Sequence, residues 1–179
     1  MGSFAMHDET HSGRRRLHLI ALTLLATFCR ADDRLASDAH ADKVVVHKKE
    51  RTLTLLDHGK ALKAYKIALG GEPVGAKMKQ GDHKTPEGNY ILDRRNERSH
   101  FYRSLHISYP NADDRAKAQN SGADPGGDIM VHGLPKGFGW LGSSHRLRDW
   151  TDGCIAVTNE EMDEIWRAVA DGTPIEIDP

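Results

Sequence analysis

The sequence is poor in cysteine and in aromatic residues, and neither sign of charge is in excess. Only two of its 179 residues are cysteine, and aromatic residues make up 6%. Lysine and arginine number 25 against 26 aspartates and glutamates. Because no basic surplus is present to follow a phosphate backbone, a nucleic-acid partner is disfavoured. Two cysteines are also too few for a disulfide-stabilised scaffold.

Long apolar runs are missing as well. The longest one, LHLIALTLLATF at 17–28, is about half of the ~20 residues that span a bilayer. Three arginines precede it, and two small residues two apart, Cys29 and Ala31, follow it. This pattern is typical of a secretory leader, although a buried amphipathic helix is an alternative. We predict a signal peptide at 1–31, cleaved after residue 31 or 41, no stable membrane anchor after its removal, and a periplasmic or secreted protein.

Export would leave a single cysteine in the mature chain. Cys29 would be removed with the leader, so Cys154 would stand alone in an oxidising compartment and could form no internal disulfide. A lone thiol there is either a small buried core residue or a reactive group.

Beyond the leader, the patterning is mainly that of β-strands, and no internal repeat or low-complexity segment is present. Residues 32–42 are small and polar and indicate a linker. Apolar residues then alternate with polar ones on both sides of His58-Gly59, a dipeptide suited to a hairpin turn. Further strands are predicted in YILD, FYRSLHISYP, DIMVHG, CIAV and PIEI. Long loops are expected at 70–89, at 110–127 with one helical turn at 112–119, and at 133–152.

One helix is predicted with both of its ends. TNEE at 158–161 is a capping box, in which the Thr158 hydroxyl and the Glu161 carboxylate bond each other's backbone amides. Apolar residues follow at helical spacing and form one buried stripe: Met162, Ile165, Trp166 and Val169. Gly172 is expected to end the helix. The domain at 43–179 is therefore predicted to be mainly β, with one clear helix and long loops that carry the function.

Two histidines are candidate partners for Cys154. His132 in MVHG and His145 in SSHR both stand in or beside predicted loops, and either imidazole could take a thiol proton. On residue types alone, an inert buried cysteine explains the pattern equally well. A metal site is disfavoured, because Asp128 and His132 would lie about 13 Å apart on a strand. The remaining histidines show no ligand spacing either, so the residues predict no metal site.

The order of three segments is more specific than any one of them. KTPEGNYIL at 84–92, DIMVHG at 128–133 and TDGCIAV at 151–157 resemble the L,D-transpeptidase catalytic domain of the YkuD type, and within it the YafK-type branch. The resemblance covers residues 43–177. It implies an L,D-transpeptidase-type β-sandwich or mixed sheet. It also implies cysteine-dependent transfer of peptidoglycan stem peptides through a thioester acyl-enzyme, without a cofactor.

The same resemblance implies a role for each matching residue. Cys154 matches the nucleophile and His132 the general base. Gly133 matches the residue whose backbone carbonyl orients that base. The amides of Gly153 and Cys154 match the oxyanion hole, and Thr151 matches the serine or threonine of the signature.

Two positions depart from the family pattern. Asp152 stands where the family has histidine, and Ala156 stands where it often has arginine. His145 and Arg148 are candidate replacements and, with Thr151 and Asp152, are predicted to bind substrate. Because a carboxylate facing the thiol would raise its pKa, Asp152 is expected to point away or to bind a substrate amine. A carboxypeptidase or amidase, a non-catalytic wall-binding module and a zinc peptidase are the alternatives.

Overall fold

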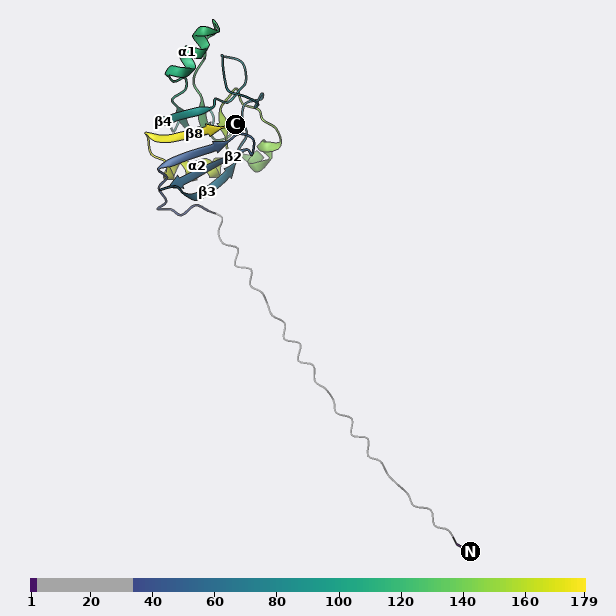
Figure 1. Cartoon of the computed structure of the whole chain (residues 1–179). Helices are drawn as coiled ribbons and strands as arrows, with labels where there is room; N and C mark the ends of the chain where they lie inside the picture. The colour runs from purple at the N-terminus through teal and green to yellow at the C-terminus, as the bar shows by residue number, and fades with distance from the viewer. Residues whose placement is uncertain (3–33) are drawn as a thin grey trace. The chain divides into compact units, whose positions relative to one another are not determined.

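The computed structural model describes residues 1–2 and 34–179 (Figure 1). The predicted leader at 1–31, apart from its first two residues, therefore lies outside the described residues, and Cys29 is one of the residues left out. In the part of the chain that is described, no helix is long and apolar enough to cross a bilayer.

An eight-stranded mixed sheet makes the domain mainly β, which confirms the predicted fold class. The strands follow the order β3-β2-β1-β8-β4-β5-β6-β7 across the sheet. β8 pairs in parallel with β1 and antiparallel with β4, so the sheet is mixed at its centre. The strands are β1 (Lys43–His47), β2 (Thr52–Asp57), β3 (Lys60–Lys66), β4 (Gly88–Asn96), β5 (Ser104–Ile107), β6 (Met130–His132), β7 (Ile155–Ala156) and β8 (Thr173–Asp178).

The hairpin between β2 and β3 forms where the sequence predicts it. His58 and Gly59 have φ angles of 50° and 78°, the left-handed backbone that a tight turn requires. Alternate residues of β2 point into the core, and Leu53 and Leu55 are fully buried. Burial of this apolar face, rather than the turn alone, stabilises the hairpin.

The predicted helix is confirmed at its start and wrong at its end. α2 (Asn159–Ala168) begins with the capping box between Thr158 and Glu161. It ends at Ala168, four residues before Gly172, because Val169 adopts an extended backbone (φ −104°, ψ 125°) and forms a β-bridge with Ala41. Pairing with a distant segment therefore ends the helix before the glycine does.

The predicted single helical turn at 112–119 is a full helix, α1 (Ala112–Asn120). Asn111 caps it and forms a capping box with Asp114, a signal equivalent to that of α2. Asp114 also accepts a hydrogen bond from the Tyr90 hydroxyl at 3.0 Å, which ties α1 to β4 (Figure 1).

The described part of the predicted linker, 34–42, packs on the domain. Leu35 and Ala41 are buried, and the Leu35 N–H donates to the Glu164 carboxylate on α2 at 3.3 Å. The Ala41 N–H donates to the Ala168 carbonyl at 2.8 Å. Burial of these two apolar side chains stabilises the packing of this otherwise polar segment against the domain.

The edge of the sheet brings Cys154 and His132 together. β6 ends at His132, and β7 begins directly after Cys154. The two strands are parallel, with Val131 opposite Ile155 and His132 opposite Ala156. Continuing this register places Met130 opposite Cys154, so the Cys154 and His132 side chains project from the same face of the sheet.

Candidate active site

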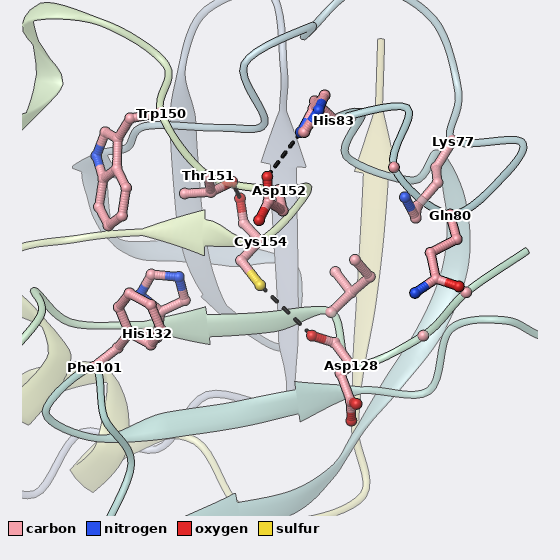
Figure 2. A pocket seen from close by; sticks show the side chains of 14 residues that line it. Lys77, Gln80, His83, Phe101, Asp128, His132, Trp150, Thr151, Asp152 and Cys154 are labelled. Atoms are coloured by element: carbon pink, nitrogen blue, oxygen red, sulfur yellow. Dashed lines mark hydrogen bonds and ion pairs between the residues drawn. The ribbon is translucent and has the colours of Figure 1, made fainter.

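A cavity of about 650 Å³ opens over this edge of the sheet (Figure 2). Cys154 and His132 both line it, and both side chains face into it in Figure 2. The other lining residues come from four segments of the chain: Lys77, Gln80, Gly81, His83, Phe101, Gly126, Gly127, Asp128, Ile129, Trp150, Thr151 and Asp152. The cavity is thus built mainly from loops that the sheet brings together.

The Cys154 thiol is protonated in the resting site. Its Sγ lies 3.6 Å from the Asp128 carbonyl oxygen, to which the S–H donates (Figure 2). Burial, with a smaller contribution from the charges of Asp152 and Asp128, raises the pKa of the thiol to about 11, against a hydrogen bond from the Met130 backbone that lowers it. At neutral pH the side chain is therefore the thiol rather than the more nucleophilic thiolate.

His132 is held as a neutral base. Its side chain is 2% exposed, and Nδ1 lies 2.6 Å from the Gly133 carbonyl oxygen. Because a carbonyl only accepts, Nδ1 carries the proton and Nε2 is left as the acceptor. Burial lowers the pKa of His132 to about 4, against the opposing effect of the Gly133 carbonyl. The ring centroids of Phe101 and Trp150 lie 4.6 and 5.9 Å from the centroid of the imidazole, and both rings pack against it.

The turn before Cys154 is closed by the Thr151 hydroxyl. This oxygen donates to the Cys154 carbonyl at 2.7 Å and accepts from the Gly153 N–H at 3.1 Å. Gly153 has a φ of 122°, and a Cβ there would lie 2.5 Å from the Lys84 carbonyl oxygen. Thr151 thus shapes the turn, and the Gly153 N–H, predicted to serve the oxyanion, already has an acceptor in the resting site.

His145 and Arg148 lie in a second pocket of about 590 Å³, which shares only Trp150 with the Cys154 cavity. His145 is buried, and burial followed by the charge of Arg146 lowers its pKa to about 4. The Trp150 indole N–H points at His145 Nδ1 at 3.5 Å. The structure therefore does not bring these two predicted substrate-binding residues into the cavity of Cys154.

Asp152 borders the cavity and faces solvent. Its side chain is 90% exposed, and its carboxylate accepts from His83 Nδ1 at 2.7 Å (Figure 2). His83 and Phe101 also line the cavity, and neither is among the site residues predicted from the sequence. His83 stands one residue before the KTPEG segment, which is the one signal that could have drawn attention to it.

Among residues 34–179, one cluster carries three potential metal-ligand atoms close together: Asp42, Asp57 and His58. Asp57 ends β2, His58 lies in the turn that follows, and Asp42 directly precedes β1. None of the three residues lines the Cys154 cavity. Their chemistry is therefore separate from that of the thiol.

The raised thiol pKa predicts how Cys154 reacts with iodoacetamide. With a pKa of about 11, only about one thiol in 10⁴ is ionised at pH 7, so the alkylation rate should climb about tenfold per pH unit up to pH 10. The rate is measured by mass spectrometry on the Cys154 peptide, because Cys29 also reacts. In the urea-unfolded chain the alkylation rate of the same peptide should reach half of its maximum near pH 8.5. A plateau below pH 8 in the folded chain would show a stabilised thiolate instead.

Comparisons with known proteins point to one family. The model of the family described as "YkuD: L,D-transpeptidase catalytic domain" matches residues 41–177. The chain is 33% identical over 132 residues to a protein of Escherichia coli (strain K12) named "Putative L,D-transpeptidase YafK", covering 70% of this chain and 46% of that protein. It therefore spans less than half the length of that relative.

Solved structures show the same fold. The helical cell shape determining protein Pgp2 from Campylobacter jejuni is 27% identical, with a TM-score of 0.57, covering 75% of this chain and 46% of that one. Bd1075 from Bdellovibrio bacteriovorus is 23% identical, with a TM-score of 0.51 over 75% of this chain and 46% of that one. At that lower identity, the likeness to Bd1075 supports the fold alone.

Proposed function

We propose, since the chain belongs to the YkuD L,D-transpeptidase catalytic domain family, that it is a cysteine-dependent L,D-transpeptidase acting on peptidoglycan stem peptides. The observation that carries the proposal is the placement of Cys154 and His132 in one cavity, with His132 Nδ1 held by the Gly133 carbonyl at 2.6 Å. That contact leaves Nε2 as the only ring atom able to take a proton. A nucleophile and an oriented base in one cleft are the parts that covalent acyl transfer needs.

Acylation would begin with the neutral pair. Cys154 Sγ attacks the carbonyl of the stem peptide while its proton moves to His132 Nε2, and His132 then protonates the departing amine. Because burial disfavours the imidazolium of His132, the proton would stay there only briefly. The product is a thioester between the stem peptide and Cys154.

The oxyanion of this step requires a backbone donor. The Gly153 N–H is engaged by Thr151 at 3.1 Å, so we assign the main role to the Cys154 N–H, with the Gly153 N–H joining if Thr151 releases it. The tight backbone at Gly153 supports this, because it fixes the amide next to the nucleophile.

Charge at the rim favours an amine as the acyl acceptor. Asp152 and Asp128 both line the cavity and have side chains that are mostly exposed. Two carboxylates there attract an incoming ammonium group. Their exposure also leaves water access to the rim, so hydrolysis by a carboxypeptidase or amidase reaction is the second candidate. We further propose that the protein works in the periplasm or outside the cell, as the predicted leader at 1–31 indicates.

The test is product analysis with purified protein, stem tetrapeptides and a D-amino acid. A transpeptidase is expected to yield exchanged or cross-linked peptides, with a mass shift of Cys154 as the acyl-enzyme. Only hydrolysed tripeptide, at every acceptor concentration, would assign the hydrolase reaction instead. No turnover and no acyl-enzyme would leave a non-catalytic wall-binding module.

A further inference from the structure

A second imidazole faces the cavity of Cys154. His83 and His132 are the two histidines among the lining residues, and in Figure 2 they lie on different sides of the Cys154 sulfur. His83 donates from Nδ1 to the Asp152 carboxylate at 2.7 Å. As in His132, this contact leaves Nε2 as the free acceptor of the ring. His83, unlike His132, is half-exposed.

The backbone around His83 is clamped against the turn that carries Cys154. The His83 carbonyl accepts from the Glu72 N–H at 3.0 Å. A Cβ on Gly70 would lie 2.2 Å from the same carbonyl oxygen and 3.1 Å from the Gly153 Cα. A Cβ on Gly153 would lie 2.5 Å from the Lys84 carbonyl oxygen. Three stretches of backbone thus meet without room for a side chain, which fixes His83 relative to Cys154.

His83 itself has a left-handed backbone, with φ at 53°. Its neighbour Asp82 holds this shape by accepting from the N–H groups of Met78, Lys79 and Lys84 at 2.8 to 3.1 Å and from the Lys77 ammonium at 2.8 Å. Burial opposes the charge on Asp82, but these donors lower its pKa to about 2. Strained backbone held by a dedicated network is a feature of functional sites.

We propose that His83 is the general base of the second half of the reaction, taking the proton of the acyl acceptor as the acceptor attacks the Cys154 thioester. Asp152 is its positioning residue, because the carboxylate orients the ring and balances the positive charge that develops on it. This inference rests on the proposed function and adds a base to the thioester-breaking step.

The acceptor N–H or O–H bond breaks, and its proton passes to His83 Nε2. A C–N or C–O bond forms at the thioester carbonyl carbon, the C–S bond breaks, and the electron pair returns to Sγ of Cys154. His83 then releases its proton through solvent, and the thiolate takes one up, so the resting thiol and imidazole are restored.

The positions of the two histidines suit them to different proton transfers. His132 is buried, lines the same cavity as the thiol and is held by the Gly133 carbonyl, which suits exchange of a proton with Sγ and the leaving amine. His83 is at the solvent-facing side, where the acceptor enters and where a proton can leave to water. The carboxylate of Asp152 next to it also attracts an ammonium acceptor to this side.

The experiment compares the full-length wild type with His83→Asn and Asp152→Asn. Asparagine tolerates a left-handed backbone, so His83→Asn removes the base and keeps the turn. The matched control is His58→Asn. His58 also has a left-handed φ of 50° and a carboxylate, that of Asp57, 2.6 Å from its Nδ1. Should His83→Asn not fold, His83→Gly allows the same backbone angle and replaces it.

Two rates are measured with a stem tetrapeptide: formation of the Cys154 thioester by rapid quench and intact mass, and its breakdown after addition of a D-amino acid. His83→Asn is expected to form the thioester within about twofold of the wild-type rate and to break it down about 10²-fold more slowly. The acyl-enzyme should accumulate. Asp152→Asn should slow breakdown about tenfold, and His58→Asn should change neither rate.

If His83→Asn breaks down the thioester at the wild-type rate, the inference is wrong. It is also wrong if formation and breakdown of the thioester slow equally, because that result indicates a structural role for His83. The proposed function has its own readout in the wild-type arm. If the wild type forms no thioester with stem peptides, the proposed function fails, and the role of His83 fails with it. If the wild type forms and resolves the thioester but His83→Asn does so equally well, only the inference fails.

Discussion

Cys154→Ala is expected to lower turnover of stem peptides by about 10³-fold or more while leaving the domain folded. The Sγ atom is the only group in the cavity placed to form a thioester, and removal of a catalytic nucleophile costs rates of this order. Its removal should change the free energy of unfolding by no more than about 1 kcal/mol, because the side chain is only partly buried. Activity is followed by chromatography of the peptides, and stability by urea unfolding.

Cys29→Ala is the matched control for this substitution. It removes the other cysteine of the chain, which lies in the predicted leader, and should leave turnover unchanged. Turnover above a few per cent of wild type in Cys154→Ala would remove the nucleophile assignment. Loss in both variants would point instead to a general requirement for thiols.

The sequence could predict the architecture because its strand signals are local. Alternating apolar residues on both sides of His58-Gly59, and the capping box at Thr158, depend on residues that are close in the chain. The end of α2 was predicted wrongly because the bridge between Val169 and Ala41 joins residues 128 positions apart in the sequence. Local patterns carry no information on such a contact.

The difference between local patterns and long-range contacts also explains which parts of the site could be predicted from the sequence. Cys154 and His132 stand in segments whose order in the chain is typical of the family, and the parallel pairing of β6 with β7 places both in one cavity. Their catalytic roles stay predictions. His145 looked equally suitable in sequence, but the predicted loop at 133–152 contains a 3-10 helix, Gly139–Leu147, which carries His145 into the second pocket.

His83 could not be predicted from residue type, because two contacts between segments that are separated in the chain define its place. Its contact with Asp152 and its packing against Gly70 both depend on the tertiary structure. Asp152 illustrates the same point. Its carboxylate is expected from the sequence to point away from the thiol or to bind an amine, and no local pattern indicates an imidazole from another loop as its partner.

The adjacent glycines at 70 and 71 allow the packing around His83 to be tested directly. Gly70→Ala is expected to destabilise the domain by about 3 kcal/mol, near the upper end for overpacking, and to lower turnover. Its Cβ would lie 2.2 Å from the His83 carbonyl oxygen, and that oxygen is already held by the Glu72 N–H. Since neither backbone can yield freely, the clash should displace His83 from Asp152 and disturb the turn at Gly153.

Gly71→Ala should leave both stability and turnover close to wild type, because no heavy atom lies within 4 Å of its Cβ position and its φ is outside the left-handed region. Urea unfolding and thioester kinetics on both variants are the measurements. If Gly70→Ala is as stable and as active as Gly71→Ala, the close contact between these backbones does not exist in solution. If Gly70→Ala loses stability but keeps wild-type thioester breakdown, the close packing of these backbones stabilises the fold but is not required to position His83.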